Sequence, residues 1–242
     1  MDVADHLAQL DADGQLLADA AERAGLDAKV VACDWTVRDL VTHTGGIHRW
    51  AADIVRTGAD TGDTEFGRAV GTGPDDRELI AWFRDGHRAL VQTLTDASED
   101  VDAFTFLPAP SAKAFWARRQ AHETGMHRAD AESAAGDITP FAADFAQDGI
   151  AEIVQGFAAR KSNAIDTPGV LGLAASDGPN WRITLGGEHI VAEPGDIADA
   201  SATVIGRSSD LYLWLWNRPS AATVSGDELL AQQWREVRVR WS

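Results

Sequence analysis

The sequence contains almost no cysteine. Among 242 residues there is a single one, Cys33, so the chain can form neither an internal disulfide nor a cysteine-rich metal site. Cys33 lies in the segment VVACDW, flanked by apolar residues. Free cysteines in such surroundings usually belong to the core. We therefore predict a buried packing role for Cys33 rather than a catalytic thiol.

Positive charge is also scarce. Lys and Arg together number 21 against 38 Asp and Glu, which gives a net charge of −17, and no basic run occurs anywhere in the chain. Nucleic acids and anionic membranes both attract clustered positive charge. The composition therefore excludes both as expected partners.

Long apolar runs and a secretory leader are lacking as well. The first residues, MDVADHLAQLDADGQ, have no basic n-region and no apolar h-region. No apolar run approaches the roughly 20 residues that a membrane-spanning helix needs. These features predict a cytoplasmic protein.

The first two-thirds of the chain has the composition of long helices, with capping and helix-ending residues at their expected ends. The second helical segment has Asp34 or Thr36 as its cap, and the fifth has Thr139 as cap with Pro140 at the first helical position. Four or five helices with short connections indicate a bundle. The predicted helical segments are residues 5–25, 34–58, 75–97, 114–136 and 139–161.

The sequence pattern changes from helical to β-prone after about residue 164. Short β-prone runs appear between Gly, Asp-Gly and Pro-Gly turns, and the segment SSDLYLWLWNRP reads as a helix ended by a proline. The last segment, ELLAQQWREVRVRW, can be helix or strand. We therefore predict an α+β protein, with a helical bundle over residues 1–163 and a small α+β domain over residues 164–242.

Three residues of the helical region could share a metal. Glu123 and His127 are four residues apart and lie on one helical face, while His43 belongs to an apolar stripe of the second segment. Each also has a simpler explanation. Glu123 and His127 could be a solvated pair on the helix surface, and His43 could be a histidine packed in the core. Brought together by facing helices, two imidazoles and a carboxylate with an open position have the composition of a catalytic zinc site.

Two further histidines compete for this role. At 100° per residue, His48 lies about 140° around the helix from His43, and His122 about 100° from Glu123. His48 therefore cannot bind the same metal as His43, and His122 cannot bind the same metal as Glu123. The favoured set is therefore His43, Glu123 and His127.

The motifs around these residues resemble a known family. WTVRDLVTHTGGIHRW followed by HETGMHRADAE resembles the mycothiol-dependent maleylpyruvate isomerase family, within the DinB-like helical bundle superfamily. The pattern ASATVIGRSSDLYLWLWNRPSAATVSGDELL is similar to the smaller, sterol-carrier-like second domain of that family.

The resemblance implies one divalent metal, bound by the histidine of a DLxxH helix and by a Glu-x-x-x-His pair, which correspond to His43, Glu123 and His127. It also implies an external low-molecular-weight thiol, mycothiol, as cosubstrate. The two glycines of THTGG depart from the family pattern, and because glycine weakens a helix interior by about 1 kcal/mol relative to alanine, they predict a kink after His43.

These features together predict a maleylpyruvate-type cis–trans isomerase, in which the thiol attacks an electron-poor small molecule. The same site would serve a mycothiol S-transferase that forms a stable conjugate. Two other classes stay open: a metal-dependent hydrolase with Glu123 or Asp130 as base, and a non-catalytic small-molecule or lipid-binding protein.

A carboxylate substrate needs a cation on this acidic protein, and arginine binds carboxylates bidentately. Arg218, after two tryptophans in LWLWNRPS, is the first candidate, although it could simply be an exposed residue at a helix end. Arg207 is the second candidate. Arg49 and Arg119 are expected on the surface.

Overall fold

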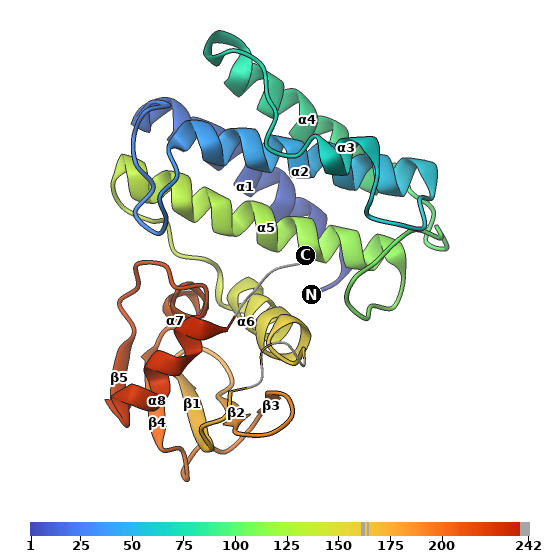
Figure 1. Ribbon diagram of the computed structural model, residues 1–242. Coiled ribbons are helices and arrows are strands. Elements are labelled where there is room, and N and C mark those ends of the chain that lie inside the picture. Colours follow the sequence, from blue (N-terminus) through green and yellow to red (C-terminus); the bar gives the residue numbers. More distant parts are fainter. Residues whose placement is uncertain (161–162, 164, 238–242) are drawn as a thin grey trace. The chain divides into compact units, whose positions relative to one another are not determined.

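The computed structural model describes residues 1–160, 163 and 165–237, and the chain divides into two compact units, Met1–Thr139 and Pro140–Ser242 (Figure 1). The first unit is helical, and the second combines helices with a five-stranded sheet. The predicted α+β class is therefore confirmed. No helix in the described ranges is long and apolar enough to cross a membrane.

The helices of the first unit begin and end at the signals that the sequence carries. Thr36 and Asp39 form a capping box at the start of α2, and Gly58, in the left-handed conformation, ends it. Asp2 and Asp5 form the corresponding box of α1. The helices are α1 (Val3–Ala24), α2 (Val37–Thr57), the short α3 (Glu65–Arg68), α4 (Asp76–Asp96) and α5 (Ala112–Ala135).

The bundle packs α1 along α5 and α2 along α4, and α2 also contacts α5 (Figure 1). A fully buried cluster that includes Leu17, Leu40 and Phe83 joins α1, α2 and α4. Apolar burial of this kind holds such helices in place, since isolated helices of this length are marginal in water. The contact between α2 and α5 is the one that positions the candidate metal ligands.

The expected kink in α2 is absent, because the helix runs unbroken through Gly45 and Gly46. Both glycines instead allow close packing. A Cβ on Gly45 would lie 2.2 Å from the Trp82 ring, and one on Gly46 would lie 3.1 Å from the backbone of Val70. Their lost helix propensity is therefore offset by close contact with the neighbouring segments.

The second unit begins with α6 (Ala143–Ala151), which continues into a π-helical turn, η1 (Glu152–Phe157). The five strands pair in the order β3-β2-β1-β4-β5, with β1 parallel to β4 and every other pair antiparallel. The remaining elements are β1 (Gly169–Ala175), β2 (Trp181–Leu185), β3 (Val191–Pro194), β4 (Ala202–Gly206), α7 (Ser208–Leu215), β5 (Thr223–Gly226), α8 (Glu228–Gln233) and the short η3 (Trp234–Glu236).

The two units divide after Thr139, which is earlier in the chain than the expected boundary after residue 163. Residues 161, 162 and 164, which flank that expected boundary, lie outside the described part of the chain. The reason is that α6 packs on α7. A Cβ on Gly149 of α6 would lie 2.5 Å from the Tyr212 ring of α7, so the two helices approach closely. The contacts of α6 therefore place the fifth predicted helical segment in the same unit as the sheet.

Two local predictions are wrong. Residues 140–142 are not helical, and Thr139 caps no helix, because its backbone N–H and its hydroxyl both donate to the Glu132 carboxylate at 2.8 and 3.0 Å. Cys33 is exposed, because VVACDW is a turn between α1 and α2 and not an apolar strand or helix.

Candidate metal centre

The candidate ligands come from two helices that pack against each other. His43 projects from α2, while Glu123 and His127 project from adjacent turns of α5. Oε1 of Glu123 lies 3.2 Å from Nε2 of His127 and 3.6 Å from Nε2 of His43. One ligand atom from each of the three residues lies within 4.8 Å of the others. The structure thus brings together the three residues that the sequence selected.

Arg119 holds the second oxygen of Glu123. Its guanidinium donates to Oε2 at 2.8 Å, one turn before the carboxylate on α5. Burial would raise the pKa of Glu123, but His127, His43 and Arg119 outweigh it and hold this pKa well below its usual range. The expectation that Arg119 lies on the surface is wrong, since only 3% of the residue is exposed.

Asp130 holds the far side of the His127 ring. Its Oδ2 lies 3.0 Å from Nδ1 of His127, and the residue is 1% exposed. Burial alone would lower the pKa of His127, but Asp130 and Glu123 together raise it to about 9. A carboxylate on one ring nitrogen fixes the orientation of the imidazole and directs the other nitrogen toward Glu123, on the side where a metal would bind.

Trp35 covers the two imidazoles from the turn before α2. Its ring centroid lies 4.9 Å from that of His43 and 6.1 Å from that of His127, and the second pair is stacked. Sequence reasoning missed this role, because Trp35 precedes the helical stripe that identified His43. The aromatic cover leaves the ligands partly open, with 24% of the His43 side chain exposed and 17% of that of Glu123.

The competing histidines point elsewhere. His48 is fully buried, with Nε2 2.9 Å from the Thr124 hydroxyl and its ring beside that of His87. Burial holds the pKa of both His48 and His87 below the usual value. His122 is also fully buried and packs edge-on against His6. None of these rings belongs to the group formed by His43, Glu123 and His127.

The donor set fits a divalent metal that binds nitrogen and oxygen. Two imidazole nitrogens and one carboxylate oxygen converge, each on a ring or carboxylate that a neighbour orients or packs against. Three protein ligands with room for a fourth is the usual composition of catalytic zinc sites. Zinc bound by two histidines and one carboxylate thus matches both the number and the chemistry of these atoms.

The predicted anion-binding arginines lie in the second unit. Arg218 follows α7, donates from its guanidinium to the Trp216 carbonyl at 2.8 Å, and lies over the Trp216 ring at 5.7 Å. Arg207 precedes α7 and is more open, with 66% of its side chain exposed beside Asp177. Arg49, also expected on the surface, is half-buried and stacks on Trp82 at 3.8 Å.

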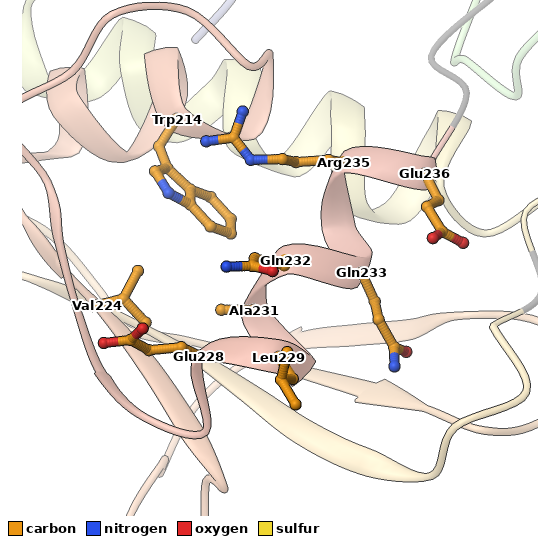
Figure 2. A pocket seen from close by; sticks show the side chains of 9 residues that line it. All are labelled: Trp214, Val224, Glu228, Leu229, Ala231, Gln232, Gln233, Arg235 and Glu236. Atoms are coloured by element: carbon orange, nitrogen blue, oxygen red, sulfur yellow. The ribbon is translucent and has the colours of Figure 1, made fainter.

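The second unit also contains a pocket of about 680 Å³ between α7, β5 and α8 (Figure 2). Trp214 forms one wall, and Arg235 extends along the same side (Figure 2). Glu228, Gln232 and Glu236 also line it. Val224, Leu229 and Ala231 add apolar surface, so the pocket has a mixed polar and apolar lining.

Comparison with known proteins agrees with this architecture. Residues 7–132 match the sequence model of the mycothiol maleylpyruvate isomerase N-terminal domain, and residues 144–233 match that of its C-terminal domain. No functionally curated protein matches the chain significantly.

Among solved structures, the chain resembles a crystal structure of the mycothiol-dependent maleylpyruvate isomerase, with a TM-score of 0.64, 16% identity and 93% of each chain covered. It also resembles a histidine-to-alanine mutant of such an isomerase, with a TM-score of 0.64, 15% identity and the same coverage. At these identities the structural likeness establishes the fold. The two domain matches, which together span most of the sequence, show that the chain belongs to the mycothiol maleylpyruvate isomerase family.

Proposed function

We propose that the protein is a metal-dependent enzyme that uses mycothiol to isomerise a maleylpyruvate-type substrate, an electron-poor cis-alkene that carries carboxylates. The observation that carries this proposal is the convergence of His43, Glu123 and His127, whose ligand atoms lie within 4.8 Å of one another. Family membership and the name of the structural neighbours support the choice of thiol and substrate.

The chain's own residues would prepare this site in advance. Arg119 and Asp130 orient the Glu123 carboxylate and the His127 ring from outside. Trp35 restricts the access of water to one side of the imidazole pair. A divalent metal bound there supplies a positive charge that favours the thiolate form of an external thiol, which is mostly protonated at neutral pH.

The isomerisation then needs no net oxidation or reduction. The thiolate of the cosubstrate adds to one alkene carbon, so that a C–S bond forms, the double bond becomes single and its electron pair moves onto the conjugated carbonyl as an enolate. Rotation about the resulting carbon–carbon single bond, followed by elimination of the thiolate, restores the double bond in the trans form. Because the thiol is returned unchanged, it is not consumed in the isomerisation.

A substrate with carboxylates also needs a cation, and we propose Arg218 for this role ahead of Arg207. Arg218 is half-buried and already oriented by the Trp216 carbonyl, so less side-chain freedom is lost on binding than for the exposed Arg207. The fork of the guanidinium suits a carboxylate.

A mycothiol S-transferase is the alternative for the same site, since an electrophile with a leaving group would keep the sulfur. The experiment that separates the two is to incubate the zinc-loaded protein with mycothiol and either maleylpyruvate or a panel of alkylating electrophiles. Products are then identified by mass spectrometry and NMR. A trans isomer of unchanged mass with full recovery of thiol supports the isomerase, whereas conjugates with loss of thiol and no isomer contradict it.

A further inference from the structure

A groove of about 610 Å³ lies in the first unit beside the candidate metal centre. One wall is the start of α2, and the other is the turn that leads into α4. Its lining includes Trp35, Arg38, Thr42, Gly71, Gly73 and Asp76. This volume falls within the range of about 300–1,000 Å³ that small-molecule sites occupy.

Trp35 connects the groove to the candidate ligands. It lines the groove and also packs on His43 and His127, with ring centroids 4.9 and 6.1 Å away. A molecule with one end at the imidazole pair could therefore extend across the indole into the groove. The groove is thus placed to receive the remainder of a ligand whose reactive group lies at the metal centre.

The charges of the groove decide which ligands fit. Arg38 is its only cation among the described residues, and it already pairs with Asp27 at 3.1 Å and with Asp76. Asp39 and Asp76 contribute two carboxylates to the lining. The groove therefore carries a net negative charge and disfavours the carboxylates of an anionic electrophile.

The same lining suits a hydroxyl-rich ligand. Carboxylates only accept hydrogen bonds and a guanidinium only donates them, whereas hydroxyl groups do both and can satisfy either partner. The Thr42 hydroxyl faces no hydrogen-bonding partner among the described residues, so it is available to a ligand. The Trp35 ring offers a flat apolar surface for the C–H face of a sugar or cyclitol ring.

We propose that this groove, between Trp35, Thr42 and the turn at residues 71–76, binds the neutral, hydroxyl-rich body of the thiol cosubstrate. The proposal rests on the proposed function and extends it by separating two subsites. The sugar-like part of the thiol lies over α2, and the anionic electrophile takes its cation elsewhere.

Filling the groove tests the proposal. Thr42 lies close to the opposite wall, because a Cβ on Gly73 would be 3.2 Å from its methyl group. Thr42→Tyr should therefore occlude the groove without touching His43, Glu123 or His127. Thr57→Tyr, at an exposed position of the same helix, is the matched control. Thr42→Gln provides a smaller obstruction if the tyrosine variant loses its circular dichroism spectrum.

The probe is N-acetylglucosaminyl-inositol, a neutral, thiol-free analogue of the sugar and cyclitol part of mycothiol, with binding followed by tryptophan fluorescence and saturation-transfer NMR. We expect Thr42→Tyr to weaken its binding at least tenfold and to raise the KM for mycothiol by a similar factor. Metal content should stay unchanged, and Thr57→Tyr should behave like the unaltered protein.

Equal affinity of the probe for Thr42→Tyr and the unaltered protein would overturn the proposal, as would the absence of binding at millimolar concentration. Because the probe has no sulfur, its binding does not depend on the reaction. Binding that Thr42→Tyr abolishes, in a protein without isomerase activity, would support the groove and refute only the proposed reaction.

Discussion

Asp130 and Glu123 approach the two nitrogens of His127 from opposite sides, at 3.0 Å from Nδ1 and 3.2 Å from Nε2. Asp130 is buried, while Glu123 faces His43 and the partly open side of the site. The ring is therefore oriented so that Nδ1 keeps its proton for Asp130 and Nε2 faces the other two candidate ligands. This arrangement is typical of histidines that bind metals.

The role of Asp130 can be measured directly. We expect Asp130→Asn to weaken zinc binding by about 10–100-fold, the usual effect of removing the partner that orients a ligating histidine. Competition against a chromogenic chelator gives the affinity. Asp53→Asn removes a carboxylate of α2 that pairs with Arg56 and serves as control. Equal affinity in the unaltered protein and the Asp130 variant would contradict this role.

The pKa of His127 predicts a pH dependence of stability in the metal-free protein. Its pKa is about 9 in the folded chain and about 6.5 in the unfolded chain. The folded state therefore binds the proton more tightly, so the stabilisation is complete below pH 6.5 and is lost as the pH rises through 9. Its full size is about 3 kcal/mol.

Urea unfolding between pH 6 and 10 measures this loss in the chelator-treated protein. The comparison is His127→Gln, which has no titrating ring at this position and should show a flatter profile over the same range. Parallel profiles for the two proteins would show that His127 is not the titrating group.

Cys33 should be dispensable for turnover. It lies exposed in the turn between α1 and α2, and the proposed nucleophile is an external thiol. We expect Cys33→Ser to keep kcat and KM within about twofold, and its stability should change by less than about 0.5 kcal/mol, as for most surface substitutions. Complete loss of activity with folding and zinc content intact would refute the external-thiol mechanism.

Arg218→Lys keeps the charge and removes the bidentate fork. If Arg218 binds the substrate carboxylate, kcat/KM should fall at least tenfold while zinc content and thiol binding stay the same. Arg207→Lys, at the N-terminal end of α7, tests the second candidate in parallel. Unaltered kinetics for the Arg218 variant, with a defect in the Arg207 variant, would move the anion site to Arg207.

The helical layout of the first unit and the grouping of His43, Glu123 and His127 could be predicted because both follow from helical periodicity. The stripe through Leu40, His43 and Ile47 identifies the face of α2 that turns inward, and the spacing of Glu123 and His127 identifies that of α5. Capping residues such as Thr36 gave the helix boundaries closely.

The parts that could not be predicted depend on tertiary contacts. Arg119 lies one turn from Glu123, yet only packing shows that the two are buried together. Thr139 has the composition of a helix cap, but the carboxylate of Glu132 competes for it. Trp35 reaches the imidazole pair from outside the helix, and no periodicity marks such a residue.

The most direct test of the central claim is the zinc content of purified, zinc-loaded protein, measured by mass spectrometry of the metal, in three forms of the chain. We predict one zinc per unaltered chain, none retained after dialysis in His43→Ala, and one in His122→Gln, because His122 lies outside the group formed by His43, Glu123 and His127. Equal loss from both variants, or full retention in His43→Ala, would contradict the assignment of the metal centre.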